Sequence, residues 1–130
     1  MTEQMLSALI ERARSETSSY PQYAAQLARE GIEGYHVDVA THAIDWRAAG
    51  VRFREVGPVV IAGDAPVAFV EAAVVRALRR NQQGETDYAG FLREIWAAGV
   101  CAYDVDLRGG CITYRGASGE QYVEAIPPLT

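Results

Sequence analysis

Residues 31–39 read GIEGYHVDV and residues 99–107 read GVCAYDVDL, so one pattern occurs twice at a spacing of 68 residues. The likeness extends without a gap over 20–49 and 88–117. Eight positions are identical in the two stretches, namely Tyr20, Gly31, Tyr35, Val37, Asp38, Ile44, Arg47 and Ala49. Average composition predicts about two identities by chance over this length. The sequence therefore predicts an internal tandem duplication, and such a repeat decides the architecture before any local feature does.

Each copy is predicted to hold two helices followed by three strands. Apolar residues at helical spacing cover 5–13, 24–28, 69–78 and 88–96. Asp64, ahead of Pro66, is expected to cap the first helix of the second copy. Strict alternation over 35–39 and 103–107 predicts strands. The result is an α+β fold, a tandem duplication of an α-α-β-β-β unit, with helices on one face of antiparallel sheet and a pseudo-two-fold axis.

The 130 residues are expected to form a single domain, with the first repeat and its linker at 1–63 and the second repeat at 64–130. One continuous six-stranded sheet and two packed three-stranded sheets both agree with the pattern.

Turn residues predict the register of the strands. The pair Gly109–Gly110 suits a two-residue hairpin turn, which would set Asp104 opposite Arg115. The first copy would then set His36 opposite Arg47, and Asp38 opposite Asp45.

The next turn would pair Arg115 with Glu120 and leave Tyr122 on the outer face beside Thr113. In the same register, Cys101 lies roughly 23 Å along the hairpin from the level of Cys111, at ~3.3 Å per residue. Bridged cysteines need Cα atoms within about 7 Å, so two free thiols are expected.

The charge balance narrows the classes of function. The formal net charge is −5 and the pI is about 5.0. An acidic chain lacks the basic surface that non-specific nucleic-acid binding and anionic membranes require. The first residues hold no basic and apolar leader, and no apolar run approaches ~18 residues. We therefore expect a cytoplasmic protein that binds neither nucleic acid nor membrane.

The second half resembles a bacterial and phage family described as domain of unknown function 1398 and as phage envelope protein-like. The residues that carry this resemblance are 86–92, 96–100, 103–107, 113–114 with Gly116, and 119–124. The segment 57–60, with the sequence GPVV, also looks like family sequence. The resemblance implies a phage or prophage connection and supplies no reaction, cofactor or catalytic residue.

One cluster of histidine and aspartate residues has the composition of a metal site. His36, Asp38, His42 and Asp45 lie within ten residues and contain the ligand types of a metal site. Because the repeat replaces His36 and His42 by Asp104 and Gly110, we expect a solvated outer sheet face with a turn histidine instead. We expect no metal, no cofactor and no catalytic residue, and we assign the repeated aromatic residues to the core.

Two functions from different classes remain. The first is a non-catalytic binding or assembly module that uses a polar sheet face, with a protein partner or a homodimer. The candidate face comprises His36, Asp38, Arg47, Asp104, Asp106, Arg115, Glu120 and Tyr122. The alternative is a small-molecule-binding protein or enzyme with a pocket where the two repeats meet, because pockets favour interfaces between packed units.

Overall fold

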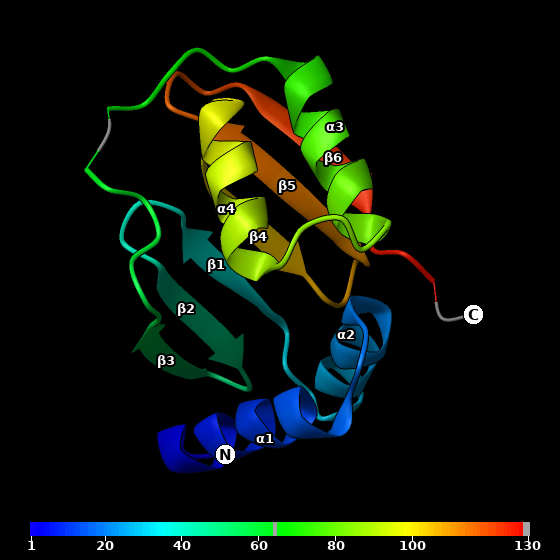
Figure 1. Ribbon diagram of the computed structural model, residues 1–130. Helices are drawn as coiled ribbons and strands as arrows, with labels where there is room; N and C mark the ends of the chain where they lie inside the picture. The colour runs from blue at the N-terminus through cyan, green and yellow to red at the C-terminus, as the bar shows by residue number, and fades with distance from the viewer. Residues whose placement is uncertain (64, 129–130) are drawn as a thin grey trace.

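A computed structural model describes residues 1–63 and 65–128 and shows an α+β fold, as predicted (Figure 1). In this part of the chain, four helices accompany one six-stranded antiparallel sheet. The first half contains α1 (Glu3–Glu16), α2 (Tyr20–Arg29), β1 (Gly34–Asp38), β2 (Ala43–Ala48) and β3 (Val51–Val56). The second half contains α3 (Glu71–Gln82), α4 (Tyr88–Ala97), β4 (Val100–Asp106), β5 (Cys111–Gly116) and β6 (Gln121–Ala125). The element order is therefore the same in both halves.

The sheet is continuous, with the strand order β3-β2-β1-β4-β5-β6. Of the two arrangements left open by the sequence, this is the single six-stranded sheet. The central strands β1 and β4 run antiparallel, and His36 lies opposite Asp104, its own counterpart at the 68-residue spacing. Tyr35 faces Val105 and Val37 faces Tyr103, so an approximate two-fold axis passes through the His36–Asp104 pair. That this symmetry arose by duplication stays a prediction.

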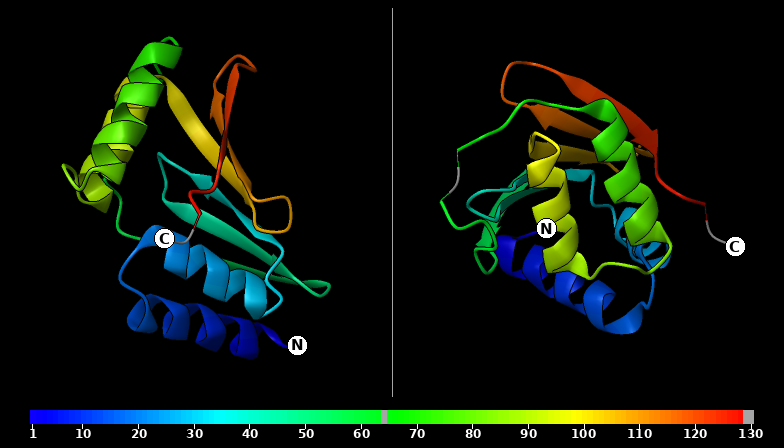
Figure 2. Two further views of the ribbon diagram at one scale, coloured as in Figure 1. Left: turned by 90° about the vertical axis from the view of Figure 1, so that its right-hand side faces the viewer. Right: turned by 45° about the horizontal axis from the view of Figure 1, so that its top comes forward.

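Both helix pairs cover the same face of the sheet, and the other face is left open (Figure 2). The side chains that alternate inward along the strands, including Val37, Trp46 and Val105, are buried beneath the helices. Leu27 and Leu92 contribute fully buried side chains from α2 and α4. Burial of one face of each helix and strand is what holds the two layers together.

Helix ends mostly follow local chemistry. The Ser19 hydroxyl accepts a hydrogen bond from the Gln22 amide at the start of α2, and Pro21 occupies the first turn. The helix α3 begins at Glu71, later than the apolar pattern from residue 69 predicts, and 67–70 is not helical. Val70 occupies the N-cap position and its side chain makes no capping hydrogen bond. The predicted cap Asp64 lies outside the described residues.

The two hairpins within β1–β2 and β4–β5 have wider turns than predicted. His36 pairs with Asp45 instead of Arg47, and Asp104 pairs with Thr113 instead of Arg115. The Asp38 and Asp106 carboxylates accept hydrogen bonds from amides three residues ahead, at 2.9 and 2.8 Å, which stabilises four-residue turns. The register moves by two residues, so every side chain keeps its predicted face.

The strand β6 shows the opposite case, a shift of one residue. Arg115 pairs with Gln121 rather than Glu120, because one more residue is used in the turn that contains Gly119 at φ +91°. Since side chains alternate with a period of two, this shift reverses the face of each β6 residue. Tyr122 therefore packs toward the helices against the buried core, and its predicted place on the outer face is wrong.

Cys101 and Cys111 are both free, as predicted, and both are partly buried. None of the helices in the described residues combines the length and the apolar character needed to cross a membrane.

Candidate functional site

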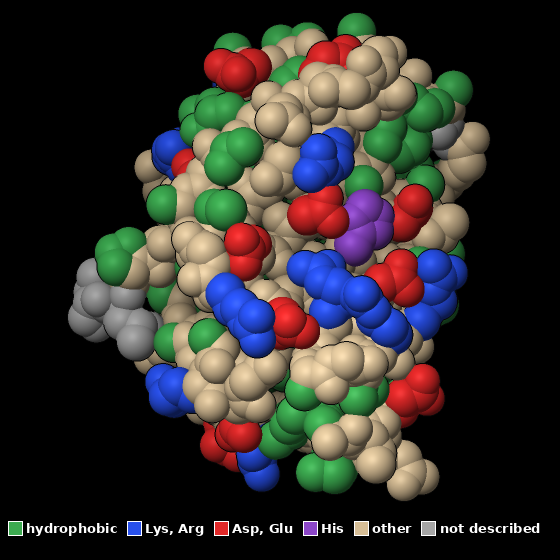
Figure 3. Space-filling view, turned by 180° about the vertical axis from the view of Figure 1, so that it is seen from behind, with side chains coloured by type: hydrophobic (Ala, Val, Ile, Leu, Met, Phe, Trp, Pro, Cys, Tyr) green, Lys and Arg blue, Asp and Glu red, His purple; other side chains and the backbone are tan. Residues whose placement is uncertain are grey.

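The outer face of the sheet carries most of the predicted binding residues, but its charges are largely paired within the chain. Figure 3 shows acidic and basic side chains interleaved across the middle of this face. Asp104 accepts hydrogen bonds from His36 and from Arg115, each at 2.6 Å, and Arg115 also donates to Gln121 at 3.1 Å. Burial alone would raise the pKa of Asp104, but these hydrogen bonds outweigh it and hold the pKa below its ordinary value.

The remaining predicted face residues serve local structure. Asp38 and Asp106 accept the turn hydrogen bonds described above. Arg47 lies opposite Gly34, where a Cβ atom would come within 2.6 Å of the guanidinium. Glu120 accepts a hydrogen bond from the Ser118 amide at 3.0 Å within the last turn. It therefore does not join Asp104 and Arg115 in their cluster of paired charges. The face is thus a satisfied surface with few unpaired groups.

The four candidate metal ligands are separated by the fold. His36 and Asp45 lie on the outer face, whereas His42 is buried on the helix side with 6% of its surface exposed. His42 does lie in the connection between β1 and β2, as expected for a turn histidine, and its ring is buried. Over residues 1–63 and 65–128, no group of three or more His, Cys, Asp or Glu side chains is placed to hold a metal ion.

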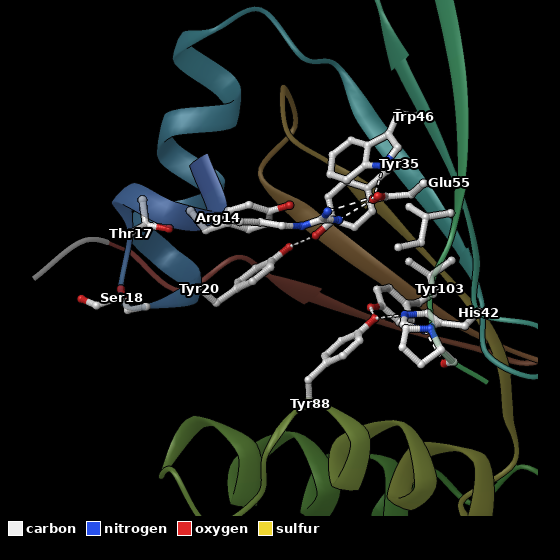
Figure 4. A pocket seen from close by; sticks show the side chains of 16 residues that line it. Arg14, Thr17, Ser18, Tyr20, Tyr35, His42, Trp46, Glu55, Tyr88 and Tyr103 are labelled. Carbon is white, nitrogen blue, oxygen red and sulfur yellow. Dashed lines mark hydrogen bonds and ion pairs between the residues drawn. The ribbon is translucent and has the colours of Figure 1, made fainter. Parts of the chain in front are cut away.

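A pocket of about 530 Å³ lies on the helix side of the sheet, between the two helix pairs. We call it the Tyr35 pocket. Arg14 of α1, Tyr20 and Tyr23 of α2, and residues 17–19 between the two helices line one side of it, and the strands β1, β2 and β3 form its floor. Tyr88 from α4 and Tyr103 from β4 close its other side (Figure 4). Its volume is within the range of ligand pockets, about 300–1,000 Å³.

One wall of the Tyr35 pocket is built on an ion pair between α1 and the edge strand β3. The Arg14 guanidinium contacts the Glu55 carboxylate with two nitrogens, and the Trp46 indole N–H donates to the same carboxylate at 2.9 Å. Burial alone would raise the pKa of Glu55, but the hydrogen bonds from Arg14 and Trp46 hold it below its ordinary value. The carboxylate is therefore ionised, and Arg14 neutralises its charge.

The opposite wall contains a chain of hydrogen bonds that ends at His42. The His42 Nδ1 atom lies 2.8 Å from the Pro58 carbonyl, which can only accept, so Nδ1 carries a hydrogen. In the neutral imidazole, Nε2 then accepts from the Tyr88 hydroxyl at 3.3 Å. Tyr88 in turn lies 3.0 Å from the Tyr103 hydroxyl. The imidazole packs directly against the backbone of Gly57. A Cβ atom at this position would fall 2.3 Å from the ring, so the close packing requires glycine there.

Four tyrosine hydroxyls meet in this region as two pairs. Tyr20 and Tyr35 lie 2.7 Å apart, and their counterparts at the 68-residue spacing, Tyr88 and Tyr103, form the second pair. Burial raises the pKa of Tyr20 to about 12, and it raises those of Tyr35 and Tyr103 well above the ordinary value. All of these phenols are therefore protonated near neutral pH and act as neutral hydrogen-bond donors.

A second pocket, of about 640 Å³, lies under the other half, and we call it the Tyr114 pocket. The two pockets share Tyr20, Tyr88 and Tyr103. Ile44 lines the first pocket and its counterpart Ile112 lines the second. The pockets are thus related by the same approximate symmetry as the strands.

Sequence reasoning assigned the repeated tyrosines to the core and overlooked their hydroxyls. A signal was present, since tyrosine rather than phenylalanine recurs at both 20/88 and 35/103. A purely apolar core does not need a hydroxyl at four matched positions. The sequence indicated His42 only as a possible metal ligand and gave no signal for Arg14 or Glu55, because the partners of all three lie far away along the chain.

Comparison with known proteins adds relatives but no activity. No family model matches the chain. Over 57 residues it is 42% identical to uncharacterized proteins of Mycobacterium bovis and of two strains of Mycobacterium tuberculosis. The match covers 44% of this chain and 35% of each relative, so the chain spans about a third of the length of the curated relatives it matches.

Proposed function

We propose that this protein binds a small, largely apolar molecule in the Tyr35 pocket. The observation that carries the proposal is the pocket itself, about 530 Å³ in volume, with an aromatic wall and a few fixed polar groups. Apolar linings with a small number of placed hydrogen-bonding groups are typical of ligand sites. Of the two functions the sequence left open, this is the small-molecule alternative.

The charges of the site favour an uncharged ligand. Arg14 and Glu55 neutralise one another, and the phenols stay protonated. A charged ligand would lose its hydration without gaining a free opposite charge, which is costly in a partly enclosed site.

The test is a binding screen with a matched pair of variants. Uncharged bicyclic and tricyclic aromatic compounds are added to the full chain, and the melting temperature is recorded, because a ligand of the folded state raises stability. Ile44→Trp narrows the Tyr35 pocket, and Ile112→Trp makes the same change in the Tyr114 pocket. We expect hits whose affinity falls at least about tenfold in Ile44→Trp and changes little in Ile112→Trp, a difference of about 1.4 kcal/mol.

Two results would overturn the proposal. One is the absence of any ligand-induced shift across the screen. The other is equal loss of binding in both variants, with circular dichroism showing that both are folded.

The polar outer face as a binding or assembly surface, and the phage connection implied by the resemblance, stay predictions. The pairing of His36, Asp104 and Arg115 within the chain leaves this face fewer free groups for a partner than the sequence suggested.

A further inference from the structure

The two tyrosine pairs differ in how their hydrogens are used. A pair of phenols holds two hydroxyl hydrogens, and the hydrogen bond between the oxygens uses one of them. In the Tyr88–Tyr103 pair, the other hydrogen has an acceptor, because Tyr103 can donate to Tyr88, and Tyr88 to His42 Nε2 in the tautomer whose hydrogen is on Nδ1. His42 is itself held by its hydrogen bond to the Pro58 carbonyl. This pair is complete.

Among residues 1–63 and 65–128, the Tyr20–Tyr35 pair has no such acceptor. The counterpart of His42 at the 68-residue spacing is Gly110, which has no side chain. In the described part of the chain, the hydrogen bond of 2.7 Å between the two hydroxyls is the one that either of them makes. Tyr35 is only 5% exposed and Tyr20 is partly exposed, and either hydroxyl can donate to the other, so the unused hydrogen can lie on Tyr35 or on Tyr20. One hydroxyl hydrogen is therefore left over beside the pocket that the pair lines.

We infer that the ligand of the Tyr35 pocket carries an uncharged acceptor oxygen, such as a ketone, ester or amide carbonyl, which accepts the free hydrogen of the Tyr20–Tyr35 pair. The inference rests on the proposed function and names the chemical class of its ligand. A buried donor without a partner is costly, and a ligand that supplies an acceptor removes that cost. A carboxylate fits less well because Arg14, the arginine that lines the pocket, is already bonded to Glu55.

The hydrogen bonds of the two tyrosine pairs also predict which way such a ligand lies in the pocket. The first pair offers a donor on the side of Arg14, whereas on the side of Tyr88 the chain already ends on His42 (Figure 4). The carbonyl is therefore expected to lie toward Tyr20 and Tyr35, with the apolar body of the ligand over Val37 and Ile44 on the floor of the pocket.

The experiment compares two probes of nearly the same shape, 2-acetylnaphthalene and 2-ethylnaphthalene, in titrations of the full chain followed by NMR. The ketone has an acceptor oxygen and the hydrocarbon has none. We expect the wild-type protein to bind the ketone about two- to thirteenfold more tightly, the range that corresponds to the net contribution of one neutral hydrogen bond. The double variant Tyr20→Phe/Tyr35→Phe should lose this preference and still bind the hydrocarbon.

The symmetry of the molecule supplies the control. Tyr88→Phe/Tyr103→Phe removes the same two hydroxyls from the other pair, and it should keep the preference for the ketone. A ketone labelled with carbon-13 at the carbonyl adds a readout that needs no variant, because a carbonyl that accepts a hydrogen bond resonates downfield of the same ketone in an apolar solvent. That shift should be present in the wild-type complex even if a double variant fails to fold.

The outcomes separate the inference from the proposed function. Equal affinity for the two probes, a bound carbonyl resonance at its apolar-solvent position, or a preference that survives Tyr20→Phe/Tyr35→Phe overturns the inference and leaves the pocket as a ligand site. Failure of both probes to bind up to their solubility limits counts against the proposed function, and the inference falls with it.

Discussion

The two halves of the molecule each tie a helix to the outer strand of their own side, but they use different positions of the sequence to do so. Arg14 of α1 pairs with Glu55 of β3, and Arg79 of α3 pairs with Glu124 of β6. The arginines are 65 residues apart and the glutamates 69, so neither pair follows the 68-residue spacing of the repeat. The fold thus recreates a contact that an alignment of the halves does not contain.

At other positions, a residue of one half has no functional equivalent at the matching position of the other half. His42 completes one tyrosine pair, whereas Gly110 at the matching position leaves the other pair open. The shared features build the sheet and the helix layer, and the differences lie in the pockets. Differences between the halves are therefore the best guide to function, and they are also where the comparison can be tested.

The largest expected effect is a difference in stability between alanine variants at the matching positions 46 and 114, which hold a tryptophan and a tyrosine. Trp46 is 1% exposed, stacks on Tyr35 with ring centroids 4.4 Å apart, and donates to Glu55. Trp46→Ala should lower the free energy of unfolding by about 3–5 kcal/mol, the cost of emptying a large buried site. Tyr114→Ala should cost less, because within the described residues the Tyr114 hydroxyl makes no comparable hydrogen bond to an ionised group.

Urea unfolding followed by circular dichroism measures both losses. Arg52→Ala, on the exposed side of β3, is the control and should leave the midpoint nearly unchanged. A loss for Trp46→Ala below that for Tyr114→Ala would contradict the ranking.

The second prediction concerns the close approach that holds His42. An added Cβ atom at Gly57 would meet the imidazole at 2.3 Å, so Gly57→Ala should cost about 1–3 kcal/mol through crowding. His42 has a φ of +58°, so Asn, which tolerates this conformation, is the suitable replacement for removing the ring.

A double-mutant cycle tests this contact. In a His42→Asn background, Gly57→Ala should cost far less than in the wild type, and chemical denaturation measures each corner of the cycle. Equal costs in the two backgrounds would mean that the crowding comes from elsewhere.

The sequence predicted the architecture well because the architecture depends on periodicity. Alternation in 35–39 and 103–107 defines which face is buried, and a register shift of two residues leaves that face unchanged. Tyr122 was misplaced because one extra turn residue reverses a whole strand, and turn length before Gln121 is not encoded by any single residue.

The candidate site was harder to predict because it depends on contacts between distant segments. Arg14 and Glu55 are 41 residues apart, and His42 and Tyr88 are 46 residues apart. A histidine in a turn is usually solvated, and only the packing of Gly57 and Pro58 against it turns the ring toward the pocket. Local patterns carry no information about such contacts.

The third prediction uses the acid dependence of the Arg14–Glu55 pair. The pKa of Glu55 is lowered in the folded state, so its contribution to stability is present above the ordinary value near 4.5 and is lost as the pH falls through the folded value. The wild-type protein should therefore be more stable than Glu55→Gln at pH 6, and the gap should narrow by about 0.5–1 kcal/mol toward pH 3.

Thermal or urea unfolding at several pH values gives this gap directly. Asp104 has a lowered pKa as well, and it is present in both proteins, so its own acid loss cancels in the comparison. Parallel stability curves for the two proteins would show that Arg14 does not stabilise the ionised Glu55.

The smallest expected effect lies on the approximate two-fold axis. There a residue pairs with its own counterpart, so identical charged residues in the two halves would face one another directly. His36 opposite Asp104 avoids this repulsion and replaces it by a hydrogen bond of 2.6 Å. His36→Asp makes the two halves identical at this position and should cost about 0.2–1 kcal/mol, since like charges opposite one another in a sheet are destabilising.

His36→Asn is the matched control, because it removes the imidazole without adding a charge. The difference between the two variants is electrostatic, so it should shrink when salt is raised from 0.05 to 1 M, where the screening length falls to about 3 Å. A difference that is the same at both salt concentrations would point to shape rather than charge at position 36. Repulsion at the axis would then not explain why the two halves differ there, although Arg115 beside Asp104 already offsets part of it.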